Sequence, residues 1–175
     1  MDLSQQQLNA ATNQKSQDFM QWALDILPLS IAVLPWGILA GSVAIDAGLT
    51  IPQAVAMSAV VFAGAAQLVS LGMWSADATA ITIAITVFFL TSQHFIYALT
   101  LRKDISVLAS YYRIPLGFLL TDELFAVAMQ KSQRRPYYLL GAGLSLYLAW
   151  VLFSVLGIYL ASTIPNLSSL HLDFS

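Results

Sequence analysis

The sequence predicts an all-α polytopic membrane protein in which some helices are interrupted or re-entrant. Of its 175 residues, 58% are hydrophobic and only 9% are charged, and the mean hydropathy is +0.75. A soluble domain carries about 25% charged residues. The apolar residues also form uncharged runs of about 20 residues, the length that a helix needs to cross the hydrocarbon. We therefore expect lipid to cover most of the chain.

The composition argues against several other classes of protein. A net charge of -2 offers no basic face to a nucleic acid. The chain has no cysteine, which excludes a disulfide framework and a Cys-based zinc site. It also has no Gly-rich phosphate loop and no HExxH, and its two histidines, His94 and His171, are far apart. We expect neither enzymatic activity nor a catalytic residue, cofactor or metal.

Charged residues punctuate the apolar runs. Asp25 and Asp46, for example, flank a run of 20 residues without charge. The polar residues 1–21 lack the basic-then-apolar pattern of a cleavable signal, so we expect a mobile N-terminal tail there and a transmembrane domain over 22–175. The pattern predicts membrane segments near residues 24–46, 54–74, 78–101 and 137–164.

A fifth apolar stretch, residues 114–130, is short and carries Asp122 and Glu123 at its middle. Before it, the apolar residues of 102–113 fall at helical spacing between charged ones. That pattern predicts a short amphipathic helix at the membrane interface.

The basic residues argue that not every segment crosses the membrane. If all five crossed, Lys and Arg would divide four to three between the two sides, without the cytoplasmic bias that membrane proteins show. If 114–130 and one of the first two segments dip in and return, all seven fall on the side of the N-terminus. We therefore expect interrupted helices and a cytoplasmic N-terminus. Breaks are favoured at Pro28, Pro35 and Gly64.

Asp122 and Glu123 are the leading candidates for function. A carboxylate at bilayer depth costs several kcal/mol unless it is solvated, paired or protonated. Adjacent helical residues point about 100° apart, so only one of the two can face a given cavity. Such a group can bind a substrate ammonium or carry a proton. The alternative is that the segment is interfacial and both carboxylates are hydrated.

Other polar and small residues in the apolar segments are further candidates. Gln93, His94 and Tyr97 lie together near the end of the third segment, and His94 could relay protons. The alternative for these three is an interhelical hydrogen bond near the interface. Gln67 is an amide that needs partners if buried. Unwound backbone at a nearby glycine could bind a zwitterion, although packing also explains the small residues, Gly37, Gly41 and Gly64.

Five elements in this order resemble the AzlC family, the large subunits of branched-chain amino acid exporters. They read LPWGILAG (34–41), IDAGLT (45–50), VFAGAAQL (61–68), SQHFIYALTLR (92–102) and LLTDELFAVA (119–128). The resemblance covers about residues 26–175. At Thr91 and Gln93 the chain departs from many relatives, which have Asn and Arg there.

The resemblance implies export of valine and of leucine, isoleucine and methionine from the bacterial inner membrane. It also implies a small hydrophobic partner subunit of the AzlD or YgaH type, and further membrane segments beyond those present here. With no nucleotide site in the sequence, we expect coupling to the proton gradient through Asp122, Glu123 or His94. Two alternatives stay open: a channel-like pore, and a structural subunit that assembles with a transporting partner.

Overall fold

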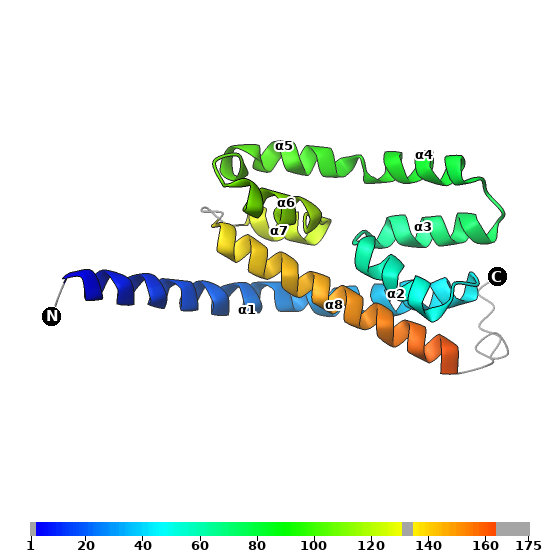
Figure 1. Ribbon diagram of the computed structural model, residues 1–175, viewed down its shortest axis with the longest axis horizontal. Coiled ribbons are helices and arrows are strands. Elements are labelled where there is room, and N and C mark those ends of the chain that lie inside the picture. Colours follow the sequence, from blue (N-terminus) through cyan, green and yellow to red (C-terminus); the bar gives the residue numbers. More distant parts are fainter. Residues whose placement is uncertain (1–2, 131–134, 164–175) are drawn as a thin grey trace. The chain divides into compact units, whose positions relative to one another are not determined.

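Helices form all the regular structure in residues 3–130 and 135–163, which are the residues described in the computed structural model. No strand occurs among them, and the predicted all-α fold class is confirmed. Figure 1 shows the helices in chain order: α1 (Leu3–Asp46), α2 (Ile51–Val60), α3 (Gly64–Ser75), α4 (Ala80–Thr91), α5 (Gln93–Ile105), α6 (Ser110–Phe118), α7 (Asp122–Met129) and α8 (Pro136–Thr163).

α1 runs without interruption through Pro28 and Pro35, so the break that the sequence predicted in the first segment is wrong. A proline removes one backbone hydrogen bond, but membrane helices tolerate the loss where neighbouring groups compensate for it. The same helix extends back to Leu3, into the stretch where the sequence predicted a polar tail. Composition alone gives no sign of that extension.

The second segment is interrupted, as the sequence predicted. α2 begins at a capping box, in which the side chain of Gln53 accepts a hydrogen bond from the Thr50 N–H at 2.9 Å. α2 ends at Val60, and Ala63, which precedes α3, is extended with φ -151°. The interruption therefore lies just before Gly64, where unwound backbone was expected. We call residues 61–63 the α2–α3 break.

α4 and α5 together form an apolar run of 26 residues over 80–105. Where they meet, the hydroxyl of Thr91 donates to the Val87 carbonyl at 2.8 Å, and that of Ser92 donates to the Phe89 carbonyl at 2.6 Å. Hydroxyls that bond back to the preceding turn often bend a helix. Two such bonds in adjacent residues explain why α4 ends at Thr91 and a separate helix, α5, begins at Gln93.

The prediction of an amphipathic interfacial helix over residues 102–113 is wrong. α5 continues to Ile105, a turn follows, and α6 begins only at Ser110. Some of the apolar residues at helical spacing belong to the end of α5, and others belong to the turn or to the start of α6. The short fifth segment is itself divided, into α6 and α7, by residues 119–121.

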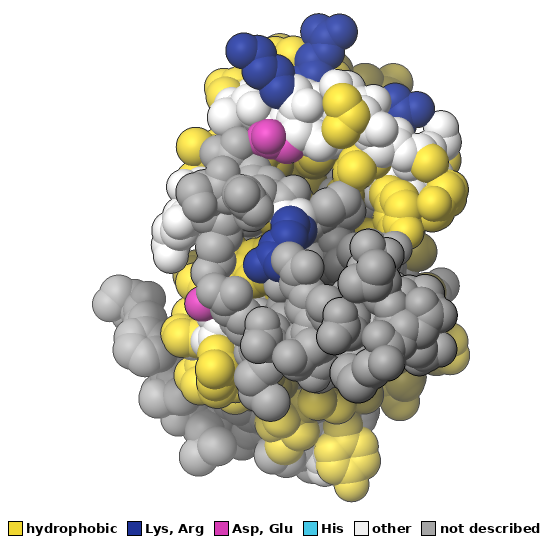
Figure 2. All heavy atoms as spheres, turned by 90° about the vertical axis from the view of Figure 1, so that its left-hand side faces the viewer, with side chains coloured by type: hydrophobic (Ala, Val, Ile, Leu, Met, Phe, Trp, Pro, Cys, Tyr) yellow, Lys and Arg dark blue, Asp and Glu magenta, His cyan; other side chains and the backbone are white. Residues whose placement is uncertain are grey.

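Three helical runs in the described chain are long and apolar enough to cross a membrane: 24–46, 80–105 and 138–163. The helices on either side of the α2–α3 break, and α6 and α7, are shorter. Two pairs of short helices thus lie where the distribution of basic residues predicted re-entrant segments, and the side of the membrane on which each loop lies stays a prediction. On the described part of the face shown in Figure 2, Lys and Arg side chains lie among hydrophobic side chains.

The chain divides into two compact units, and the long helices α1 and α8 each contribute one part to each unit. Unit 1 contains residues 1–31 and 93–147, and unit 2 contains residues 32–92 and 148–175. Each unit is described by itself.

Glycines bring α1 and α8 together within unit 2. A Cβ added at Gly41 would lie 2.0 Å from the Ser154 carbonyl oxygen, and one at Gly157 would lie 2.1 Å from that of Ile38. The Ser42 hydroxyl donates to the Gly157 carbonyl at 3.2 Å across the same crossing. Small residues permit such close approach in membrane helices.

Candidate functional site

A polar cluster in unit 1 joins the start of α5 to the start of α7. We call it the Asp122 cluster, and it consists of Gln93, His94, Tyr97, Asp122 and Phe125. The Gln93 amide nitrogen lies 3.2 and 3.3 Å from the two carboxylate oxygens of Asp122 and donates to them. These residues are 29 positions apart in sequence, so the fold brings together two motifs that the sequence only suggested separately.

The local chain explains why Asp122 is presented at a helix end. Thr121 is the N-cap of α7, and its hydroxyl accepts from the Leu124 N–H at 3.4 Å. Asp122 is the first residue of the helix, where the N-terminal dipole favours a negative charge. Behind it, Leu124 is buried, and a Cβ added at Gly143 of α8 would meet Leu119 and Leu124. Close packing against α8 therefore fixes the start of α7.

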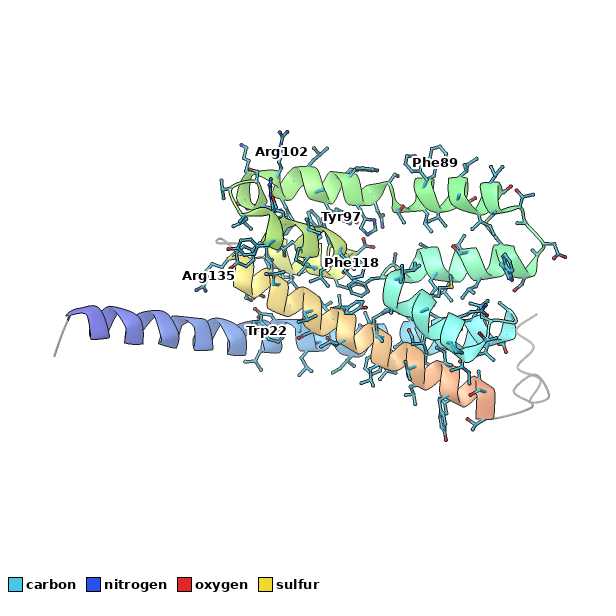
Figure 3. The ribbon with its side chains drawn as sticks, in the orientation of Figure 1. Trp22, Phe89, Tyr97, Arg102, Phe118 and Arg135 are labelled. Carbon is cyan, nitrogen blue, oxygen red and sulfur yellow. The ribbon has the colours of Figure 1, made fainter. Side chains whose placement is uncertain are left out.

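Aromatic rings form one wall of the cluster. Figure 3 shows Tyr97 on the side of α5 that faces α6 and α7. Its ring stacks on Phe125, with centroids 4.3 Å apart, and meets His94 edge to face at 5.6 Å. The Tyr97 hydroxyl lies close enough to the Asp122 carboxylate to interact with it electrostatically. The carboxylate thus has an apolar, π-rich surface beside it.

Asp122 has no ion-pair partner among the residues that the structure describes. Its hydrogen-bond donor is the neutral amide of Gln93. Glu123, the next residue, is half-buried and also lies near Tyr97. The cluster can therefore receive a cationic group at Asp122, and it has two carboxylates and one imidazole that can exchange protons.

The other candidate residues from the sequence lie in unit 2. Gly37 and Gly41 are buried at the α1–α8 crossing, where a Cβ would collide with Phe153 or with Ser154. These two glycines therefore allow α1 and α8 to pack closely. Gly64 begins α3 and faces the ring of Trp150, and Gln67 is buried one turn further along.

Gln67 belongs to a second polar cluster that the sequence did not predict in full. Its amide nitrogen donates to the Ser58 hydroxyl at 3.0 Å, and the Trp150 indole nitrogen donates to the Ser58 carbonyl at 3.2 Å. Ser154 follows one turn after Trp150 and is fully buried. We call Ser58, Gln67 and Trp150 the Ser58 cluster.

No pattern in the sequence singled out Ser58, Trp150 or Ser154. Single serines are common in membrane helices, and a tryptophan within an apolar run looks like packing. An interhelical contact that depends on the α2–α3 break cannot be read from spacing. A similar pair in unit 1, in which the Tyr138 hydroxyl donates to Asp25 at 2.6 Å, was also not predicted.

The described chain is all-α, with three runs long and apolar enough to cross a membrane, interrupted helices and polar clusters at helix ends. These features are typical of a membrane transport protein. The chain matches the family described as AzlC protein over residues 28–164. It therefore belongs to the AzlC family, as the sequence motifs indicated.

Two relatives are about equally similar. Over 153 residues the chain is 30% identical to "Inner membrane protein YgaZ" of Escherichia coli K12, covering 84% of this chain and 62% of the relative. Over 151 residues it is 30% identical to "Uncharacterized membrane protein" of Archaeoglobus fulgidus, covering 86% of this chain and 66% of the relative. The chain thus spans less than two thirds of the length of each. No solved structure matches the chain.

Proposed function

We propose that this chain is a subunit of an exporter for branched-chain amino acids, with valine as the first substrate and leucine, isoleucine and methionine as others. The observation that carries the proposal is the Asp122 carboxylate, which is held by a neutral amide and has no cationic partner among the described residues. Membership of a membrane transport family supports the class of function. The family resemblance, rather than the geometry, supports the choice of substrate.

The substrate ammonium would bind at Asp122. Asp122 is exposed on the described chain. A carboxylate without a cationic partner attracts an ammonium, and the attraction grows where lipid or protein excludes water. The stacked rings of Tyr97 and Phe125 lie beside it. Aromatic faces attract cations and also accept aliphatic side chains. An α-amino group joined to a branched hydrocarbon chain has both of these chemistries.

Proton coupling would use the same cluster. A carboxylate that binds an ammonium must release it before a new cycle, and protonation of Asp122 would do so by removing its charge. Glu123 and His94 lie nearby and could pass the proton on. We place this cycle in the bacterial inner membrane with the N-terminus in the cytoplasm.

A small hydrophobic partner subunit is also part of the proposal. α4 packs against α3 but has no buried residue. Several of its apolar side chains are exposed: Ile81 is 72% exposed, Phe88 58% and Phe89 69%. Such a helix needs lipid or protein around it, and a partner subunit could cover part of it.

Valine counterflow in proteoliposomes tests the role of Asp122. Vesicles loaded with unlabelled valine should accumulate labelled valine, and Asp122→Asn should lower the initial rate roughly 10-fold or more, since it removes the charge that binds the ammonium. Asp46→Asn is the matched control, because Asp46 is also an exposed carboxylate but lies at the end of α1, outside the Asp122 cluster. Its counterflow should equal that of the wild type.

The same assay separates this proposal from the two alternatives. A passive pore would equilibrate the label without accumulation. A structural subunit would show the same counterflow, or none, with and without Asp122. Equal rates for Asp122→Asn and Asp46→Asn would refute the assignment of Asp122.

A further inference from the structure

One side of α5 is exposed on unit 1 and carries both apolar and basic side chains. Its apolar members are Phe95, Ile96 and Leu99, which are 63%, 64% and 67% exposed. Arg102 and Lys103 follow in the last turn of the helix and are also exposed. We call these five residues the outer face of α5.

Helical spacing puts the five side chains on one face of α5. Leu99 lies four residues after Phe95 and three residues after Ile96. Arg102 and Lys103 lie three and four residues after Leu99. Residues three and four apart are neighbours on a helix surface. The outer face is therefore an apolar stripe that ends in two adjacent cations.

The opposite side of α5 packs into unit 1. Leu101 is 1% exposed, and the Tyr97 ring stacks on Phe125 of α7. Figure 3 shows Tyr97 on the side of α5 that faces α6 and α7, and Arg102 pointing the other way. These contacts fix the rotation of α5 about its axis. The outer face is thus turned toward the surroundings of unit 1.

The two cations of the outer face have no ion-pair partner among the residues that the structure describes. The neighbouring acid, Asp104, is half-buried and lies three residues after the buried Leu101, on the inward side of the helix. Long basic side chains can lie along apolar surface while their charged ends reach the interface. The outer face therefore attracts a molecule that joins an anionic group to hydrocarbon.

We propose that the outer face of α5 binds an anionic phospholipid, with the phosphate at the two cations and an acyl chain along the three apolar side chains. From Phe95 to Lys103 the helix rises about 12 Å. One leaflet of the hydrocarbon core is about 15 Å thick, so the lengths agree. This inference goes beyond the proposed function and does not depend on it.

Other occupants fit the outer face less well. A free phosphate would leave the apolar stripe uncovered, and a lipid without net charge would leave the two cations uncompensated. A protein partner would have to bury carboxylates against the cations, which costs desolvation energy. A lipid headgroup keeps its charge at the interface, where water remains.

Thermal unfolding of the purified protein in a nonionic detergent tests the site. Dioleoyl phosphatidylglycerol, which is anionic, is compared with dioleoyl phosphatidylcholine, which has the same acyl chains and no net charge, and with inorganic phosphate. Phosphatidylglycerol should raise the unfolding temperature in a saturable way, by roughly 3–6 °C at ten times its half-saturating concentration. The other two compounds should not. Mass spectrometry of the intact protein gives an independent readout, because it counts bound lipid molecules.

Arg102→Gln combined with Lys103→Gln should weaken phosphatidylglycerol binding roughly 30-fold, since each basic residue near a membrane surface strengthens binding about 5-fold. Both side chains are exposed, so stability without lipid should not change. Leu99→Asn should also weaken binding, because it interrupts the apolar stripe. The matched control is Arg102→Lys combined with Lys103→Arg, which keeps both charges and should bind like the wild type. Arg135→Gln, which removes a charge outside the outer face, should also keep the binding.

Four results would overturn the inference. One is an equal rise with phosphatidylcholine and phosphatidylglycerol, which would show that the cations do not select the lipid. Another is an equal rise with inorganic phosphate, which would indicate a site for a free anion. The third is equal binding by the wild type and the variant without the two charges. The fourth is no rise with any compound, which would show that protein covers this face. None of these measurements uses an amino acid, so a failure of valine transport would leave them unaffected.

Discussion

Single residues divide here into those whose chemistry shows in the sequence and those whose role depends on the fold. A carboxylate and an amide in apolar segments stand out, and Asp122 and Gln93 indeed meet. Gly37 and Gly41 also stood out, but the structure places them at a helix crossing. Ser154 did not, because its burial follows from the close approach of α1, which no sequence pattern reports.

The glycine crossing in unit 2 yields a prediction at this scale. Gly157→Ala should destabilise the protein by about 1–3 kcal/mol, since the added Cβ would lie 2.1 Å from the Ile38 carbonyl and force the helices apart. Gly72→Ala is the control, because no atom lies within 4 Å of its Cβ position. Thermal unfolding in detergent should show a lower midpoint for the first change alone. A Gly157→Ala protein as stable as wild type would mean that the crossing is looser.

Among the elements, the interrupted helices were the most predictable, and the residues at which helices begin and end were the least predictable. Gly64 and the carboxylates of the fifth segment indicated where helices would be short, and α2, α3, α6 and α7 are short. The two prolines of α1 gave the wrong indication, because a proline removes only one hydrogen bond from a long helix. Periodicity over 102–113 also failed, since it cannot show that one helix ends and another begins.

A hydrogen bond between two elements of unit 1 gives a second prediction. The Tyr138 hydroxyl of α8 donates to Asp25 of α1 at 2.6 Å. Tyr138→Phe should lower the stability by about 1.5–3 kcal/mol, because it leaves a part-buried carboxylate without this donor. Tyr159→Phe, on an exposed side chain of the same helix, should change little. The unfolding midpoints of the two variants compare them, and equal midpoints would show that the bond adds no stability.

For the whole molecule, the distribution of basic residues predicts three crossings, and three helical runs of the described chain are long and apolar enough to cross. That agreement was within reach of the sequence, since both depend on composition. Which part of each long helix belongs to which unit was not, because it depends on contacts between residues far apart in the sequence.

Cysteine labelling tests the proposed topology, and the chain has no cysteine of its own to interfere. Val107→Cys, at a position 81% exposed, and Ser132→Cys should both be protected from an impermeant maleimide in intact cells. Ala76→Cys, in the turn after α3, should be labelled. Labelling of the first two from opposite sides would rule out a re-entrant fifth segment.

We propose above that Asp122 binds the ammonium of a branched-chain amino acid. The most direct measurement is competition in valine counterflow by valine and by 2-hydroxyisovalerate, which has a hydroxyl in place of the ammonium. We predict that valine competes and the hydroxy acid does not, and that Asp122→Asn lowers counterflow while Asp46→Asn leaves it intact. Equal competition by the two compounds, with full activity in Asp122→Asn, would contradict the claim.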